Sequence, residues 1–202
     1  MSGEGKPILD TLDQVRCFFE EIARMFGALD PIMAVSHWSP VGGTTVINQT
    51  SQSLTQPRRW MPQHAFRVYK SKSRPELIAV IKVLMSREFQ SAHHEPAVEP
   101  LLAGVLLDFG AGRDASKVWQ YEHAAWHPKL EGRADPSRVQ TILRTADKAC
   151  RAFRVAVWSV PLVAIQGSEA LKTHTIDVID PWVAGNPARQ APARPEDATT
   201  PA

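Results

Sequence analysis

The stretch LLAGVLLDFGAGRDASKVWQYEHAAW, residues 101–126, decides how the rest of the chain is interpreted. Its first part, 101–109, is apolar apart from Gly104 and Asp108 and closes on a glycine-containing turn, which is typical of a buried β-strand. Residues 118–123 then alternate between aromatic and mostly polar side chains, which is the two-residue period of a half-buried strand. The stretch therefore predicts a β-hairpin at the centre of one sheet.

Helix and strand patterns surround this hairpin. Capping residues and apolar spacing of three or four predict helices over 10–27, 74–88 and 135–150. Further strands are expected over 66–70, 153–160, 162–166 and 173–179. The order of these elements predicts an α+β fold, in which about three helices pack on a mostly antiparallel sheet.

Length and composition predict one domain rather than several. With 202 residues and 44% hydrophobic content, residues 1–183 are expected to form a single domain with its own core. Residues 184–202 are rich in proline and alanine and are expected to be a disordered tail. The first ten residues lack the basic start and apolar core of a secretory signal, and no apolar run is long enough for a membrane span. We therefore expect a cytoplasmic protein, with Cys17 and Cys150 as buried free thiols.

Charge is unevenly distributed along the chain. Residues 31–75 contain six arginines and lysines and no aspartate or glutamate, whereas the whole chain carries only +2, so the remainder is net acidic. Aromatic side chains are interleaved with these bases, as in surfaces that bind single-stranded nucleic acid. The segment 58–74 therefore predicts an interface for nucleic acid or another anionic partner, formed by Arg58, Arg59, Trp60, Arg67, Tyr69, Lys70, Lys72 and Arg74.

One part of this interface has a more specific expected geometry. Arg67 and Tyr69 should share one side of a strand, and the helix expected from residue 74 would add free backbone amides beside Lys70, Lys72 and Arg74. Such amides and bases together can bind a phosphate group. The alternative for the same segment is a long loop, in which the bases are solvated and the aromatic rings cover the edge of the core.

A second functional class is a protein-interaction or inhibitor module. The chain contains six tryptophans, which is more than a small core requires, and exposed tryptophans commonly anchor protein interfaces. Salt separates this class from nucleic-acid binding, because phosphate-dominated binding weakens steeply with salt and binding anchored by aromatic rings does not.

A third class is a small enzyme. The run Asp108-Phe-Gly110-Ala-Gly112 resembles the first motif of class I S-adenosylmethionine methyltransferases, which implies a strand that ends at the cofactor. The chain departs from that family directly afterwards, because the strand expected from Val118 leaves no room for the helix of a crossover connection. His174, Asp177 and Asp180 suggest a hydrolase instead, but no serine lies in a recognisable nucleophile motif.

Metal binding finds little support in the sequence. His93, His94 and Glu95 have the right side chains for a transition metal, but adjacent histidines point in different directions and no further ligand is suitably spaced. The sequence as a whole predicts a non-catalytic binding module without cofactor or metal, whose partner is nucleic acid or an acidic protein surface. It leaves the oligomeric state open.

Overall fold

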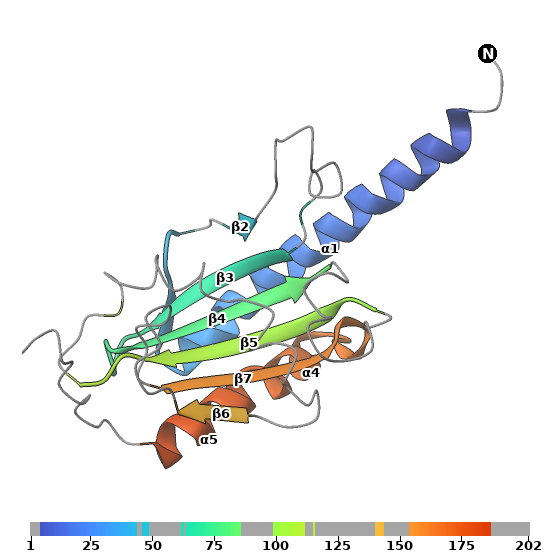
Figure 1. Cartoon of the computed structure of the whole chain (residues 1–202). Coiled ribbons are helices and arrows are strands. Elements are labelled where there is room, and N and C mark those ends of the chain that lie inside the picture. The colour runs from blue at the N-terminus through green and yellow to red at the C-terminus, as the bar shows by residue number, and fades with distance from the viewer. Residues whose placement is uncertain are drawn as a thin grey trace, which may run out of the picture.

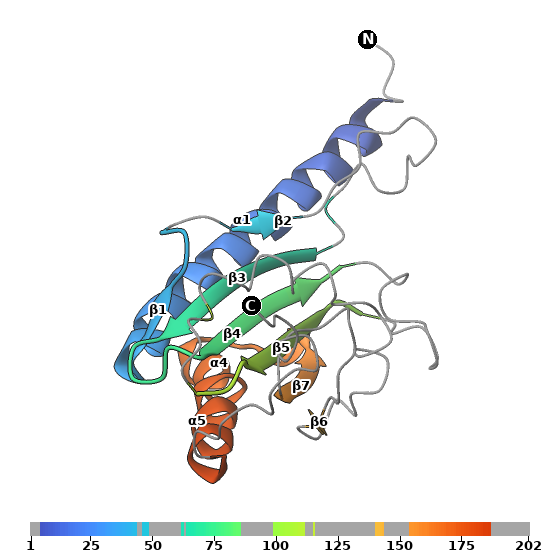
Figure 2. The ribbon, with the colours of Figure 1, turned by 60° about the vertical axis from the view of Figure 1, so that its left-hand side comes forward.

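The described helices of the protein lie on one face of an antiparallel sheet (Figures 1 and 2). The computed structural model describes residues 5–43, 46–48, 62, 64–85, 99–111, 115, 140–143 and 154–186. Within these residues the helices are α1 (Lys6–Val35), α4 (Ser168–Thr173) and α5 (Ile176–Gly185), with the short 3₁₀ helix η6 (Leu162–Ala164). The strands are β1 (Trp38–Pro40), β2 (Ile47–Asn48), β3 (His64–Ser71), β4 (Leu77–Leu84), β5 (Leu101–Asp108), β6 (Gln140–Leu143) and β7 (Arg154–Pro161).

All strand pairs of the sheet are antiparallel. The order across the sheet is β1-β3-β4-β5-β7-β6, and β2 also pairs with β3. The predicted α+β class with an antiparallel sheet is thus confirmed, and β5 lies at the centre as expected. The predicted hairpin partner of β5 is wrong, because β4 occupies one edge of β5 along its whole length and β7 occupies the other. Residues 118–126, the expected partner strand, lie outside the described residues.

Two cores lie on opposite faces of the sheet. The core under the helices combines α1, α4 and α5 with strand residues such as Tyr69, Ile81 and Leu106. The core on the other face contains Phe66, Val80, Val105 and Val157, among others. Alternate residues of each strand therefore enter different cores, which is the ordinary consequence of the strand period.

A close contact between β5 and β7 explains the glycine at the centre of the sheet. Gly104 and Trp158 are paired across the two strands, and a side chain added at Gly104 would meet the Trp158 ring at 2.0 Å. The indole therefore lies over the glycine, and its Nε1 donates a hydrogen bond of 2.9 Å to the carbonyl oxygen of His174, at the end of α4. This contact ties α4 to the middle of the sheet.

Strand β4 replaces the helix that was expected over 74–88. Every residue of β4 is buried, and the run is apolar except at Lys82, so it satisfies a helical period as well as a strand period. β-Branched residues dominate it and favour a strand buried on both faces. The polar residues before it form a turn, in which the Arg74 amide donates to the Ser71 hydroxyl, so there is no helix start at which amides could bind a phosphate.

Three other predictions of secondary structure are wrong. The strand expected over 162–166 is not formed, because residues 162–164 are the 3₁₀ helix η6. Residues 140–143 form the edge strand β6 instead of part of a helix, and the rest of 135–150 lies outside the described residues. The strand expected over 173–179 is instead the end of α4 and the start of α5, because Ile176, Ile179 and Trp182 bury one face of a helix. Only one of the three expected helices, 10–27, is therefore found where it was predicted.

Helix α1 is longer than its sequence signals indicate. It begins at Lys6 and continues through Gly27 and Pro31 to Val35. Leu29 and Met33, beyond the glycine, are fully buried, and burial of two such side chains offsets the cost of a glycine and a proline in the helix. The expected burial of Cys17 is wrong, because its side chain is exposed on the outer side of α1.

Helix α5 continues through Gly185, so the first residues of the expected tail are helical. Trp182 is buried against the core, as predicted for the last anchored residues. Residues 187–202 lie outside the described residues.

Candidate functional site

Arg67 and Tyr69 share one side of β3, as the sequence predicts, but that side faces α1. Arg67 is 3% exposed and Tyr69 is fully buried. The carboxylate of Asp30 on α1 accepts hydrogen bonds from Arg67 Nε at 2.7 Å, Arg67 Nη2 at 2.5 Å and the Tyr69 hydroxyl at 2.9 Å. Arg67 Nη2 also donates to the carbonyl oxygen of Gly43 at 2.7 Å. We name these three side chains the Asp30 cluster; it joins α1 to the sheet and does not present Arg67 or Tyr69 to an external anion.

The cluster shifts the ionisation of both of its β3 members. Burial raises the pKa of Tyr69 well above its ordinary value, and the hydrogen bond to Asp30 raises it further. The hydrogen bond to Asp30 also raises the pKa of Arg67, which outweighs the opposite effect of burial. Tyr69 is therefore neutral and Arg67 charged over the whole physiological range.

The buried phenol should make the stability of the fold fall with pH in alkaline solution. The pKa of Tyr69 is raised in the folded state, whereas in the unfolded chain it has its ordinary value of about 10. Above that pH the unfolded chain loses a proton that the folded chain keeps, so the free energy of unfolding should decrease by up to about 1.4 kcal/mol per pH unit. Urea unfolding at a series of alkaline pH values measures this slope.

The matched control is Tyr69→Phe. It removes the titrating hydroxyl and leaves Tyr121, the other tyrosine of the chain, unchanged. The variant should lack the part of the slope that Tyr69 contributes. Identical slopes in the two proteins would show that the pKa of Tyr69 is not raised in the folded state.

Arg74 belongs to a second polar cluster under the helix layer. It donates to Glu76 from Nε at 2.8 Å and to the carbonyl oxygen of Asn186 from Nη1 at 2.8 Å. Asp108, 1% exposed, accepts from Arg154 Nε at 3.0 Å and from the Gly110 amide at 2.8 Å. These residues form what we name the Asp108 cluster: Arg74, Glu76, Asp108, Arg154 and Asn186.

The Asp108 cluster fixes the end of α5 to the ends of three strands. Arg154 Nη1 donates to the side-chain oxygen of Asn186 at 2.8 Å, and the Arg154 guanidinium lies 5.3 Å from the centre of the Trp182 ring. Two bases and two acids give the cluster no net charge. Asp108 therefore stabilises the fold. Its strand β5 has antiparallel neighbours on both sides, whereas the methyltransferase resemblance implies a parallel sheet.

The other predicted contact residues do not complete a basic surface in the described part of the chain. Lys72 is exposed, and Lys70 is half-buried on the face of β3 opposite Arg67. Arg58, Arg59 and Trp60 lie outside the described residues. Nucleic-acid binding by segment 58–74 thus stays a prediction, which depends on these five residues rather than on Arg67, Tyr69 or Arg74.

The tryptophans that are described belong to the core. Trp38, Trp158 and Trp182 are each at most 8% exposed, so none of the three can anchor a partner in this structure. Trp60, Trp119 and Trp126 lie outside the described residues. An interface anchored by tryptophan therefore stays a prediction for those three residues.

The expected hydrolase residues come from two helices instead of one strand. Asp180 on α5 accepts a hydrogen bond of 2.8 Å from the Ser36 hydroxyl, and Asp177 lies 3.8 Å from the Lys172 ammonium. Within the described part of the chain, the Ser36 hydroxyl bonds to a carboxylate and not to a histidine, and no three metal-ligating side chains converge. The His93-His94-Glu95 run lies outside the described residues. The first contact joins the end of α1 to α5 and the second joins α4 to α5, and neither gives a serine the histidine base that the hydrolase hypothesis requires.

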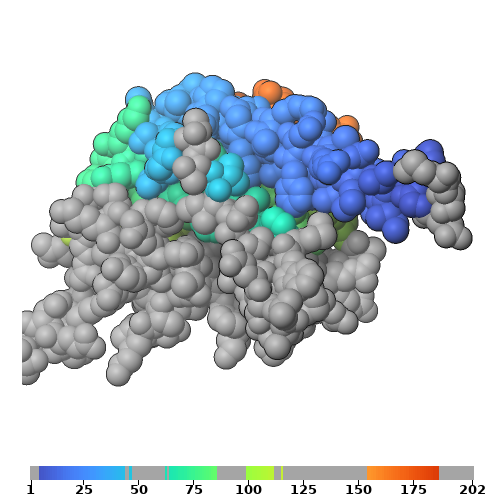
Figure 3. All heavy atoms as spheres, turned by 90° about the horizontal axis from the view of Figure 1, so that it is seen from above, coloured from blue at the N-terminus to red at the C-terminus, as the bar shows by residue number. Residues whose placement is uncertain are grey.

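The N-terminal half of α1 projects beyond the sheet. At 1.5 Å per residue its 30 residues span about 45 Å, whereas an eight-residue strand such as β3 spans about 27 Å. The first buried residue of α1 is Ile22. Figures 1 and 2 show the dark blue N-terminal turns of the helix beyond the strand ends, and Figure 3 shows them at the right-hand end of the molecule.

The projecting half carries apolar side chains that are largely exposed near its start and half-buried at Val15. Ile8 is 64% exposed, Leu9 61% and Leu12 47%, while Val15 is half-buried. We call these four residues the projecting stripe. They continue the buried face of α1. The sequence pattern predicted that this whole face is buried in the core, because an apolar pattern does not show where the sheet beneath the helix ends.

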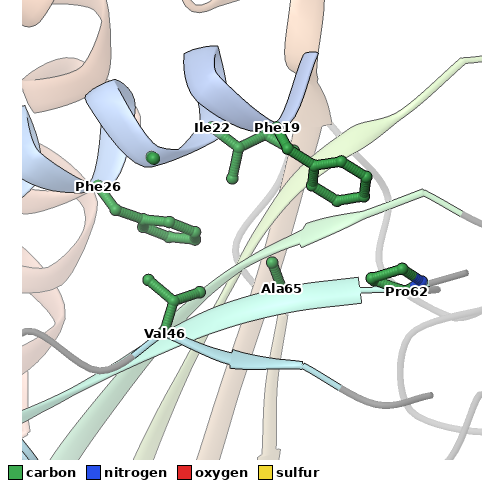
Figure 4. Close-up of a pocket in the computed structure, with 7 residues that line it drawn as sticks. Phe19, Ile22, Phe26, Val46, Pro62 and Ala65 are labelled. Carbon is green, nitrogen blue, oxygen red and sulfur yellow. The ribbon is translucent and has the colours of Figure 1, made fainter. Parts of the chain in front are cut away.

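An apolar pocket of about 330 Å³ begins where α1 leaves the sheet. In Figure 4, Phe19, Ile22 and Phe26 point from α1 towards the residues on the opposite wall. That wall is formed by Val46, Pro62 and Ala65, and Ala23 completes the lining. The pocket therefore extends the apolar surface of the projecting stripe towards β3.

No family model, curated protein or solved structure matches the chain. No described helix has both the length and the apolar character needed to cross a membrane. The candidate site is therefore identified by structural features alone, namely an apolar helix surface beside an apolar pocket.

Proposed function

We propose that this protein is a non-catalytic interaction module that binds another polypeptide along the projecting stripe. The observation that carries this proposal is the exposure of Ile8, Leu9 and Leu12 on a helix that extends beyond the end of the sheet. Contiguous apolar surface on a folded protein usually marks a binding site. Because these side chains are about half exposed, covering them is worth roughly 1–2 kcal/mol each before the costs of association.

The form of the surface favours a helical partner. A projecting helix offers one apolar stripe to one side, and a second amphipathic helix can pack along it with its own residues at spacings of three and four. The pocket at Phe19, Ile22 and Phe26 can accept one larger apolar side chain from that partner. An interface of this kind is specific in shape but does not require charge.

The charges beside the stripe support apolar binding over anion binding. Lys6 pairs with Asp10 at 2.7 Å and Arg16 with Asp13 at 2.6 Å, both within the helix. Arg24 pairs with Glu20 at 3.3 Å further along. Because each base near the stripe has an acidic neighbour, we expect binding that changes little with salt.

Site-specific photo-cross-linking tests the proposal. A benzoyl-phenylalanine introduced at Leu12 should form adducts with a partner polypeptide in an extract of the source cells, because the probe is apolar and lies on the stripe. The same probe at Gln14, which is exposed on another side of α1, is the matched control and should form few adducts. Adduct yield at Leu12 should be similar at about 50 and about 200 mM salt, a range over which phosphate-dominated binding weakens by orders of magnitude.

Two results would contradict the proposal. Equal yields at Leu12 and Gln14 would show that the stripe is not the binding surface. Adducts that contain nucleic acid and disappear at the higher salt would instead favour the predicted anionic partner.

A further inference from the structure

The apolar residues of α1 follow one uninterrupted pattern along the whole helix. They lie alternately four and three residues apart, at Ile8, Leu12, Val15, Phe19, Ile22, Phe26, Leu29 and Met33. The last four are buried against the sheet, and the first three belong to the projecting stripe. This alternation, with a mean of 3.5 residues, is the repeat that matches one helix to another in a coiled coil. The projecting half therefore has the pattern of a helix whose partner is a second helix.

Two complementary features lie at opposite ends of the projecting half. Ile8 and Leu9 are exposed apolar side chains near its start, and the pocket wall formed by Phe19, Ile22 and Ala23 lies near its end. Ile8 and Phe19 are eleven positions apart, or about 16 Å along the helix axis. A two-fold axis between them would bring each feature against its counterpart in another molecule, because an interface of this symmetry is self-complementary.

We infer that the partner on the projecting stripe is a second copy of this chain, with the two α1 helices antiparallel. This inference rests on the proposed function and names its partner. Pairing Leu12 with Val15 of the second copy also places Ile8 opposite Phe19 of that copy. Ile8 and Leu9 of each molecule then lie at the mouth of the other's pocket, and the two sheets lie at opposite ends of the helix pair.

Charge does not oppose this pairing. The positions beside the seam formed by Ile8, Leu12 and Val15 are Leu9 and Arg16 on one flank and Thr11 and Phe18 on the other. In an antiparallel pair of helices Leu9 meets Arg16 and Thr11 meets Phe18, so no two like charges face each other across the seam. The long stem of Arg16 can cover Leu9 while its guanidinium remains with Asp13.

The size of the interface sets the expected affinity. The segment from Lys6 to Ala23 is about 27 Å long. A single pair of helices of this length lies at the low end of the interface size range, below about 1,200 Å² in total. We therefore expect an equilibrium between monomer and dimer in the micromolar range.

Sedimentation equilibrium of the full chain tests the inference. The average mass should rise from monomer to dimer as the protein concentration increases through the micromolar range. Leu12→Glu should weaken the dimer at least about 100-fold, because each dimer loses two buried leucines and gains two buried charges. Leu12 is 47% exposed, so the variant should still fold, which circular dichroism verifies. Gln14→Glu adds the same charge on another side of α1 and should leave the equilibrium unchanged.

Disulfide trapping tests the antiparallel arrangement. In a background with Cys17→Ser and Cys150→Ser, chains with Leu12→Cys are mixed with chains carrying Val15→Cys. Antiparallel helices should give mainly disulfides between the cysteine at position 12 of one chain and the cysteine at position 15 of the other. Parallel helices would instead give disulfides between two cysteines at position 12 and overturn the antiparallel arrangement. A monomer at all concentrations, or a dimer that Leu12→Glu leaves intact, would overturn the inference itself.

The cross-linking experiment separates this inference from the proposed function. Adducts at Leu12 with another copy of the chain support both. Adducts at Leu12 with a different polypeptide and none with the chain itself overturn the second copy as partner, while the proposed function stands. No adducts at Leu12 overturn both.

Discussion

Replacing Asp30 by alanine should lower the free energy of unfolding by about 3 kcal/mol, because it leaves two buried groups without their main partner. Arg67 would lose the carboxylate that accepts from its Nε and Nη2, and the Tyr69 hydroxyl would lose its acceptor. Asp30 itself is partly exposed at 32%, so water can replace some of the lost interaction, and we expect less than the full cost of an orphaned buried charge. Urea unfolding monitored by tryptophan fluorescence measures the change.

A surface ion pair of the same helix provides the matched control. Asp13 pairs with Arg16, and both side chains are more than half exposed. Asp13→Ala should change the free energy of unfolding by at most about 0.5 kcal/mol, because exposed pairs contribute little. If Asp30→Ala were no more destabilising than Asp13→Ala, the Asp30 cluster would have no part in holding α1 to the sheet.

The second large effect is expected at Asp108. Asp108→Ala should lower the free energy of unfolding by about 3–5 kcal/mol, because Arg154, itself 5% exposed, would stay buried and lose the carboxylate that accepts from its Nε and Nη2. The Gly110 amide would lose its acceptor as well. Chemical denaturation of the purified variant gives the value, and loss of soluble protein would indicate that the change exceeds the total stability of the fold.

A double variant separates the charge from the packing. Asp108→Leu combined with Arg154→Leu replaces both ions of this pair by apolar side chains and leaves Arg74 paired with Glu76. We expect it to be more stable than Asp108→Ala, since a buried ion pair costs most when only one partner is removed. A double variant that is no more stable than the single variant would show that the main contribution of Asp108 is not its pairing with Arg154.

Local sequence patterns correctly predicted those elements whose packing in the folded protein agrees with the pattern. Strand β3 followed from the alternation of Phe66 and Val68 with Arg67 and Tyr69, and β5 and β7 followed from short apolar runs with turns at their ends. Strand β4 was missed because a run that is apolar at nearly every position fits both periods, and its capping signal belonged to a turn. The helices after residue 167 were missed because β-branched residues suggested strands, whereas burial of Ile176, Ile179 and Trp182 determines the conformation.

The candidate site shows a different limit of sequence reasoning. The bases of segment 58–74 were visible, but the acid that neutralises Arg67 is Asp30 on α1, and the acids near Arg74 are Glu76, just after the segment, and Asp108 on β5. Charge segregation along the chain is therefore not charge segregation in space. The projecting stripe was visible as an apolar pattern, yet its exposure depends on the relative lengths of α1 and the sheet, which no single segment encodes.

The Asp30 cluster also protects β3 from misalignment. If β3 slipped by one residue against β4, Arg67 and Tyr69 would move to the opposite face, and Phe66 and Val68 would take their place under α1. A guanidinium would then be buried in the apolar core that now holds Phe66, with no carboxylate to meet it, at a cost far above that of a displaced methyl group. The Asp30 cluster therefore discriminates between two alignments that hydrophobic burial alone would separate poorly.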